Sequence, residues 1–314
     1  MNTIFDLTNR KYQLLTILGA TASGKTAVAT QAALAFNAEI ISGDSRQIYR
    51  GMDLGTGKDI NEYTINGVSI PYHLIDIEDA GAEYNVYRFQ TDFNEAYSDI
   101  VGREKFPILC GGSGMYLESV LNNYNLIHVP KNIELRKKLQ SKSLEELSNL
   151  LRSYKNTHNN SDTETKRRAI RAIEIEIFIQ ENQQLPANSN TINSLVVGVL
   201  FDRDTRRERI SMRLQQRIDE GMINEVRKLL EMGIKPEQLI YYGLEYKYLT
   251  MHVVGELSYK DMYSQLEIAI HQFAKRQMTW FRRMEKNGTK IHWLNGEMPM
   301  DEKIYSIKQL LNKE

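Results

Sequence analysis

The sequence predicts an α/β protein in which helices flank a parallel sheet and a helical subdomain is inserted between two strands. Short apolar segments at residues 13–18 and 38–42 enclose an alanine-rich helical segment at 27–36. A strand, a helix and a strand in such close succession form a βαβ unit with parallel strands and a right-handed crossover. Further apolar segments at 106–110 and 195–201 supply additional strands.

A polar segment separates the last two of these strands. Residues 130–190 are polar, helical in pattern and bounded by Pro130 and the loop around Pro186. Because this segment is too long for a simple connection, we expect residues 1–129 and 191–314 to form the core and residues 130–190 to form a helical insertion. After Phe201 the pattern is again mostly helical.

The composition excludes several classes of protein. Of 314 residues, 41% are hydrophobic and 25% are charged, as in globular chains and unlike disordered or collagen-like ones. A single cysteine, Cys110, excludes a disulfide framework and a four-thiolate zinc site. No apolar segment approaches the roughly 20 residues of a membrane span, and the N-terminus lacks a signal-peptide pattern. We therefore expect a cytoplasmic monomer that is not bound to a membrane.

The formal net charge is zero, but charge is unevenly distributed along the chain. Residues 1–130 carry 9 Lys and Arg against 15 Asp and Glu, whereas residues 131–314 carry 31 against 25. Ordinary scatter of surface charge explains this asymmetry, and so does a catalytic N-terminal half joined to a half that binds a polyanion. The charge distribution alone does not distinguish the two interpretations, so the sequence motifs are considered next.

The strongest motif predicts a phosphate-binding loop. Residues 19–26 read GATASGKT, which matches G-x-x-x-x-G-K-[ST], between a predicted strand and a predicted helix. The glycines let backbone N–H groups surround an anion, and the helix directs its positive end toward that anion. Lys25 then reaches the terminal phosphate oxygens, and the Thr26 hydroxyl coordinates Mg²⁺. The alternative is a purely structural glycine turn.

The acid expected beside this loop is Asp44. An NTP-hydrolysing enzyme usually carries an Asp after another apolar strand as a second Mg²⁺ anchor, but the strand at 106–110 runs into Gly-Gly-Ser-Gly. Asp44 follows the strand at 38–42, and ligands bind outside the carboxyl ends of parallel strands. Its carboxylate would accept a proton from an attacking hydroxyl or amine, unless it only caps the next helix.

Six segments, in this order, resemble the tRNA dimethylallyltransferases, also called tRNA isopentenyltransferases or the IPP transferase family. They are GATASGKT (19–26), GDSRQIYRGMDLGTGK (43–58), PYHLID (71–76), GGSGMYL (111–117), RRAIRAIE (167–174) and AKRQMTWFR (274–282). The resemblance implies a P-loop-kinase-like parallel sheet with an inserted helical subdomain that contacts the tRNA anticodon stem-loop. It also implies that the loop binds a diphosphate leaving group rather than ATP.

The resemblance further implies a reaction. A dimethylallyl group would pass from dimethylallyl diphosphate to the exocyclic N6 amine of the adenosine that is 3′-adjacent to the anticodon in tRNA. Diphosphate would be released, and Mg²⁺ would be the cofactor.

The same resemblance assigns roles to individual residues. The residues that would bind diphosphate are Gly19, Thr21, Ala22, Ser23, Gly24, Lys25 and Thr26, and Thr26 would also hold Mg²⁺. Asp44, Lys25 and Ser113 would be catalytic, with Lys25 neutralising charge on the leaving group. The residues that would contact tRNA are Asp44, Ser45, Arg46, Gln47, Arg136, Arg167, Arg168, Arg171, Lys275 and Arg276. A bidentate contact from Gln47 to adenine is chemically apt.

Two positions depart from the family pattern. No arginine stands just before Gly243, and His271 stands where the family has an arginine. Because both family arginines lie near phosphates, we expect other residues, such as Arg206 or Arg276, to supply that charge.

Several other side chains have a functional and a structural interpretation. Arg206, Arg209, Arg213 and Arg217 share one helix face, which either contacts phosphate or is solvated and paired with acids. Residues 271–290 mix 6 basic residues with aromatic ones, which suits single-stranded bases; Trp280 nevertheless fits a core role better. His73 has no other His or Cys at metal spacing, which favours a structural role.

Two other functions stay open from the sequence. A small-molecule P-loop kinase would consume ATP, but it would need the second acidic Mg²⁺ anchor that the strand at 106–110 does not provide. An RNA-binding module with an inactive loop is disfavoured by the intact Lys25, Thr26 and Asp44.

Overall fold

The computed structural model describes residues 11–154, 161–182 and 191–313. The chain forms two compact units, Met1–Asn123 with Asn190–Glu314, and Tyr124–Ser189. The second unit begins six residues before the predicted insertion at 130–190, and the predicted boundary at Pro186 lies outside the described residues. Within the described ranges, none of the helices combines the length and the apolar character that crossing a membrane requires.

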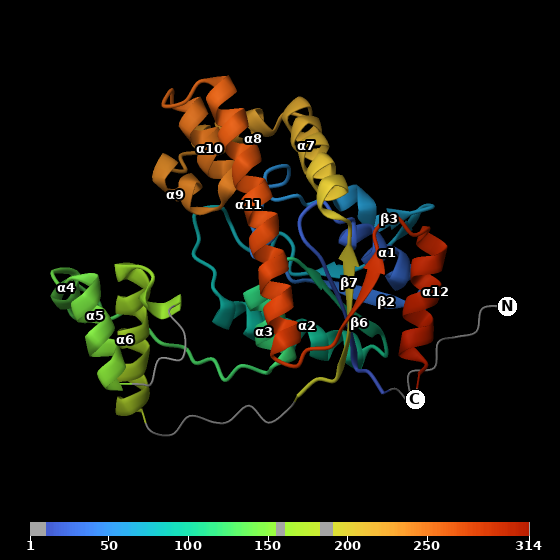
Figure 1. Cartoon of the computed structure of the whole chain (residues 1–314), viewed down its shortest axis with the longest axis horizontal. Helices are drawn as coiled ribbons and strands as arrows, with labels where there is room; N and C mark the ends of the chain where they lie inside the picture. Colours follow the sequence, from blue (N-terminus) through green and yellow to red (C-terminus); the bar gives the residue numbers. More distant parts are fainter. Residues whose placement is uncertain (1–10, 155–160, 183–190, 314) are drawn as a thin grey trace. The chain divides into compact units, whose positions relative to one another are not determined.

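A six-stranded sheet in the order β5-β2-β6-β1-β7-β8 forms the centre of the first unit (Figure 1). Each neighbouring pair of strands is parallel, which confirms the predicted fold class. The strands are β1 (Leu14–Leu18), β2 (Ala38–Ser42), β5 (Tyr72–His73), β6 (Phe106–Gly111), β7 (Ser194–Leu200) and β8 (Ile291–Asn295). A separate antiparallel pair consists of β3 (Thr64–Ile65) and β4 (Val68–Ser69).

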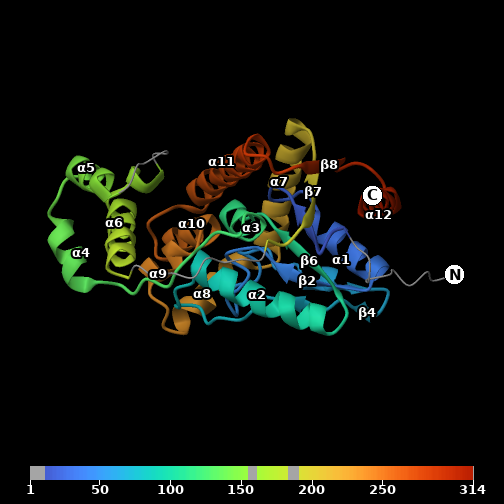
Figure 2. The same cartoon turned by 90° about the horizontal axis from the view of Figure 1, so that it is seen from below.

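Helices cover both faces of this sheet (Figures 1 and 2). The helices of the first unit are α1 (Lys25–Phe36), α2 (Val86–Gly102), α3 (Gly114–Leu121), α7 (Arg203–Asp219), α8 (Met222–Glu231), α9 (Pro236–Tyr241), α10 (Leu244–Val253), α11 (Tyr259–Lys286) and α12 (Met300–Leu311), with a 3₁₀ turn at Ile60–Tyr63. Among them, α8, α9 and α10 pack against other helices rather than on the sheet. Because side chains alternate along a strand, Leu15 and Ile17 of β1 join the core under α1 and α12. Leu14 and Leu18 join the core under α2, α3 and α11.

The strand β8 was not predicted, because its sequence lacks an apolar run. Within Ile291–Asn295 only Ile291 and Leu294 are buried. The strand is held by its register with β7, in which Val196 pairs with Ile291. An edge position leaves one side of a strand unpaired, so polar residues are tolerated there. The segment after Phe201 is mostly helical, as expected, with β8 as an addition.

The second unit is a small helical subdomain with its own core. It contains α4 (Ile133–Gln140), α5 (Leu144–Tyr154), a 3₁₀ turn at Ser161–Thr163 and α6 (Lys166–Glu181). The core side chains come from all three α-helices and include Leu139, Leu147, Leu151 and Ile173. Asn132 caps the N-terminus of α4, and its side chain accepts a hydrogen bond from the Leu135 amide.

The carboxyl ends of β1, β6 and β2 lie side by side, because these three strands are neighbours in the sheet. Leu18 is in register with Gly111, and the Gly43 amide donates to the Cys110 carbonyl at 2.7 Å. A Cβ atom on Gly111 would lie 2.4 Å from the Gly43 carbonyl oxygen. Only glycine therefore lets the chain segments that leave β6 and β2 approach this closely.

We expect Gly111→Ala to destabilise the protein by about 1–3 kcal/mol, since backbone atoms would have to move to admit the methyl group. The matched control is Gly102→Ala at the end of α2, where a Cβ meets nothing within 4 Å. Urea denaturation followed by circular dichroism measures both changes. Equal stabilities for the two variants would show that the contact between Gly111 and Gly43 does not constrain the sheet.

Candidate active site

The loop after β1 has the backbone conformation of an anion-binding turn. Ala22 and Gly24 adopt left-handed conformations, with φ of 61° and 74°, and α1 begins at the next residue, Lys25. Alternation of right- and left-handed residues produces a concave run of backbone N–H groups that suits an anion. The first turn of α1 holds no acidic side chain, so nothing there opposes the positive end of the helix.

Two side chains distant in sequence hold this loop in place. Gln277 of α11 accepts a hydrogen bond from the Thr21 amide and donates one to the Gly112 carbonyl, both at 2.9 Å. Arg209 of α7 donates from Nε to the Ala22 carbonyl at 2.9 Å. The Thr21 amide was predicted to bind diphosphate, but it donates its hydrogen bond to Gln277 instead. Neither tether was predicted, although Gln277 lies in the AKRQMTWFR segment.

A cavity of about 800 Å³ lies against the loop and is lined on its other sides by α7 and the segment around the 3₁₀ turn. Its basic lining residues are Lys25, Lys58, Arg209, Arg213 and Arg217, and its acidic ones are Asp53, Asp59, Glu62 and Glu220. Arg209, Arg213 and Arg217, which were predicted to share one helix face, therefore line the same cavity as the loop at residues 22–26. Arg206, predicted on the same face, does not line this cavity.

Asp59 pairs with two of these arginines. Arg213 Nη2 lies 2.5 Å from Asp59 Oδ2, and Arg217 Nη2 lies 3.0 Å from Asp59 Oδ1. Burial, followed by the nearby charge of Arg217, lowers the pKa of Arg213, and Asp59 opposes that effect. The carboxylate thus holds together two guanidinium groups that would otherwise repel each other.

Lys25 shares its environment with Asp44. Burial lowers the pKa of the Lys25 ammonium, and the charge of Arg213 adds to this effect, whereas the charges of Asp44 and Asp59 oppose it. The Cys110 thiol contributes no charge at neutral pH, because burial raises its pKa to about 12. Lys25 follows β1 and Asp44 follows β2, and the strand between them, β6, is a neighbour of both.

Three hydrogen bonds hold the segment that carries Asp44 in place. Asp44 Oδ1 accepts from the Arg46 amide at 3.0 Å, which holds the carboxylate at the start of its own turn. The Ser45 amide donates to Ser113 Oγ at 3.0 Å, and Ser113 Oγ donates to Ser45 Oγ at 3.2 Å. Ser113 thus joins the loops after β6 and β2, and this contact positions Asp44.

Gln47, predicted to read adenine, is already hydrogen bonded at both ends of its amide. Its Oε1 accepts from Ser42 Oγ and its Nε2 donates to the Gly57 carbonyl, both at 3.0 Å. A bidentate contact to adenine would have to replace these two bonds. In this structure Gln47 shapes the segment around Asp44.

Lys275 and Arg276 lie on the exposed face of α11, whereas Gln277 next to them is buried.

Trp280 is half-buried rather than fully in the core, and the Arg283 guanidinium carbon lies 3.9 Å from its ring centroid. His271 is on α11, with Nε2 3.5 Å from Ser211 Oγ of α7, and it does not line the cavity described above. The charge of the missing family arginine is therefore not replaced at that position.

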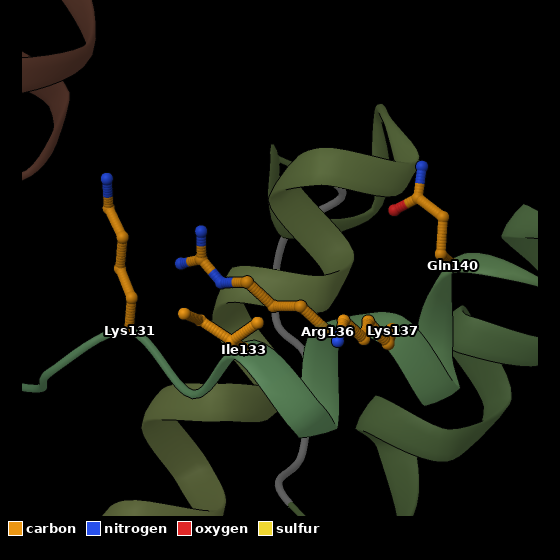
Figure 3. A pocket seen from close by; sticks show the side chains of 5 residues that line it. All are labelled: Lys131, Ile133, Arg136, Lys137 and Gln140. Carbon is orange, nitrogen blue, oxygen red and sulfur yellow. The ribbon is translucent and has the colours of Figure 1, made fainter.

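Arg136, Arg168 and Arg171, which were predicted to bind RNA, are paired with acids in the second unit. Arg136 and Arg171 both bind Glu174, whose side chain is only 2% exposed. Arg168 pairs with Glu164, and Arg167 and Arg168 are both exposed. Figure 3 shows Lys131 on the segment before α4, and Arg136 and Gln140 on α4; these side chains line a surface hollow. Arg136 thus combines a structural ion pair with a place on this surface.

The parallel sheet, and the anion-binding loop that leaves its strand β1, define a P-loop-like α/β protein. The family model for IPP transferase matches residues 47–284, and the chain belongs to this family. It is 56% identical to tRNA dimethylallyltransferase 1 of Parabacteroides distasonis, over 97% of this chain and 99% of that protein. It is 58% identical to tRNA dimethylallyltransferase 2 of Phocaeicola vulgatus, over 96% of this chain and 98% of that protein.

Solved structures give the same result. The chain resembles the full-length tRNA isopentenylpyrophosphate transferase of Bacillus halodurans with a TM-score of 0.70 and 31% identity, covering 96% of this chain and 95% of that one. The family and the fold class predicted from the sequence are therefore confirmed.

We expect Asp59→Asn to change the affinity of the cavity for inorganic diphosphate, because Asp59 lines the cavity and competes for Arg213 and Arg217. Removal of this anion frees two guanidinium groups for bidentate contact, so diphosphate should bind several-fold more tightly in titration calorimetry. Asp301→Asn on the exposed start of α12 is the control. A weaker affinity in Asp59→Asn would mean that Asp59 holds the arginines in their binding positions.

Proposed function

We propose that this member of the IPP transferase family transfers a dimethylallyl group from dimethylallyl diphosphate to the N6 amine of the adenosine 3′-adjacent to the anticodon in tRNA. Dimethylallyl transfer to tRNA is the activity named for its relatives. One observation carries the proposal: the loop after β6 is joined both to the loop after β1 and to the segment that carries Asp44. Gln277 bonds to Thr21 and Gly112, and Ser113 accepts from the Ser45 amide. An anion site and a proton acceptor are thus present at one edge of the sheet.

The anion site suits a diphosphate leaving group. As the C–O bond of an allylic diphosphate breaks, negative charge grows on the diphosphate and positive charge spreads over the allyl group. Backbone amides of the loop and the cations Lys25, Arg209, Arg213 and Arg217 would stabilise the growing negative charge. The nucleophile attacks the allylic carbon, and the phosphorus atoms take no part in bond formation or cleavage in this step.

Asp44 would act at the other reaction partner. The adenosine N6 forms a bond to the allylic carbon and becomes cationic, and the Asp44 carboxylate accepts the proton that N6 loses. The Arg46 amide and the link between Ser45 and Ser113 keep that carboxylate in place. The adenosine must leave its stack to reach this position, and Ser45 and Arg46 would contact the displaced base.

The described residues fit a Mg²⁺ ion at this cavity. Thr26 lines it, and so does Glu62, whose Oε2 is buried and has no hydrogen-bond partner among the described residues. Burial, and then the charge of Asp59, raises the pKa of the Glu62 carboxyl. Carboxylate and hydroxyl oxygens are ligands that Mg²⁺ prefers, so we propose that Thr26 and Glu62 hold the ion, which would neutralise charge on the diphosphate.

The remaining contacts would be made to the tRNA backbone. We propose that the exposed Lys275 and Arg276 of α11, and Arg167 and Arg168 of α6, bind phosphates of the anticodon stem-loop. We also propose that the protein acts as a monomer in the cytoplasm.

The proposed reaction predicts that labelled dimethylallyl diphosphate transfers its label to bulk bacterial tRNA in the presence of Mg²⁺, without consumption of ATP. Asp44→Asn should lower kcat by about 10²–10⁴-fold, because it removes the proton acceptor, while tRNA affinity in a filter-binding assay stays nearly unchanged. Consumption of ATP without labelling of tRNA would point to a small-molecule kinase instead. Equal losses in kcat and in tRNA affinity would make Asp44 a binding residue only.

The proposed metal site predicts that Glu62→Gln weakens the binding of Mn²⁺, used as a paramagnetic substitute for Mg²⁺. A neutral amide oxygen is a poorer ligand than a carboxylate, so the dissociation constant with inorganic diphosphate present should rise about tenfold or more. Electron paramagnetic resonance of free Mn²⁺ measures this constant without relying on turnover. The control is Glu220→Gln at the outer lining of the cavity, and equal constants in both variants would remove Glu62 from the metal site.

A further inference from the structure

Tyr241 is an exposed aromatic residue beside the segment that carries Asp44. Its side chain, at the end of α9, is 45% exposed. The Arg46 guanidinium carbon lies 5.9 Å from the centroid of the Tyr241 ring, and the amide of the same Arg46 binds the Asp44 carboxylate. An exposed ring and a cation thus stand together next to the proposed proton acceptor.

The neighbouring residue holds this ring in a defined position. Tyr242 is buried, and its hydroxyl accepts from the Gly81 amide at 2.6 Å and donates to the Ala82 carbonyl at 2.9 Å. Its ring packs edge-on against Tyr49, with centroids 4.5 Å apart. The backbone at Tyr241 is therefore anchored from the interior, and little conformational entropy would be lost when a ligand stacks on the Tyr241 ring.

We propose that Tyr241 and Arg46 form a stacking platform for a nucleobase that flanks the target adenosine. This inference rests on the proposed function, since a base that leaves its stack also exposes the faces of its neighbours. Aromatic rings stack on unpaired bases, while an adjacent arginine attracts the phosphate that follows. The Gln47 amide, in contrast, is occupied by Ser42 and Gly57.

The variants that test the platform differ only at exposed side chains. Tyr241→Ala removes the ring, and Tyr241→Phe keeps the ring while removing the hydroxyl. Tyr305→Ala on α12 is the matched control, because Tyr305 is also exposed, at 64%. Thermal denaturation of each variant should give the midpoint of the wild type, since the interior contacts of Tyr242 remain.

The experiment combines these variants with anticodon stem-loop RNAs that lack the base on the 5′ or the 3′ side of the target adenosine. In the wild type, loss of the stacked base should lower kcat/KM about tenfold or more. Tyr241→Ala should show a similar loss with intact RNA and no further loss with that abasic RNA. Tyr241→Phe and Tyr305→Ala should behave like the wild type.

Binding without turnover supplies a second measurement. An RNA with 2-aminopurine at the flanking position should lose fluorescence when it binds the wild type, because stacking quenches this base, and should lose less with Tyr241→Ala. The inference is overturned if Tyr241→Ala has the kcat/KM of the wild type with intact RNA. It is also overturned if removal of the flanking base lowers kcat/KM as much in Tyr241→Ala as in the wild type. Either result leaves labelling of tRNA by the wild-type enzyme intact, so it would not count against the proposed function.

Discussion

The order of three parallel strands governs the whole candidate site. Because β1, β6 and β2 are neighbours, the loops that follow them leave the same edge of the sheet. The loop after β1 supplies the proposed anion site, the loop after β2 supplies Asp44, and the loop after β6 supplies Ser113, which bonds to Ser45. The close approach of Gly43 and Gly111 keeps the last two loops together, so the chemistry depends on a backbone contact that involves no reactive group.

An acidic side chain compensates part of the concentrated positive charge of the cavity. Lys25 and the arginines of α7 lie in a partly desolvated space, where like charges repel strongly. Asp59 balances Arg213 and Arg217 inside the protein. In the proposed reaction, the diphosphate would interact favourably with these cations and would compete with Asp59 for Arg213 and Arg217.

Local patterns in the sequence predicted the fold class, the phosphate-type loop and the position of Asp44. These features depend on contiguous residues, such as the apolar run of β1 and the motif at 19–26. The tethers could not be predicted, because Gln277 lies 256 positions from Thr21 and Arg213 lies 154 positions from Asp59. Whether Gln47 or Arg136 contacts RNA or another part of the protein likewise depends on partners that only the fold brings near, as Glu174 shows for Arg136.

The most direct test of the account is a crystal structure with dimethylallyl S-thiolodiphosphate, in which sulfur replaces the oxygen that leaves and the bond to carbon resists cleavage. The anomalous signal of sulfur locates the reacting end of the molecule. The account predicts that the diphosphate lies against residues 22–26, which include Lys25, with the allylic carbon directed toward Asp44. A diphosphate bound elsewhere, or an allylic carbon directed away from Asp44, would contradict it.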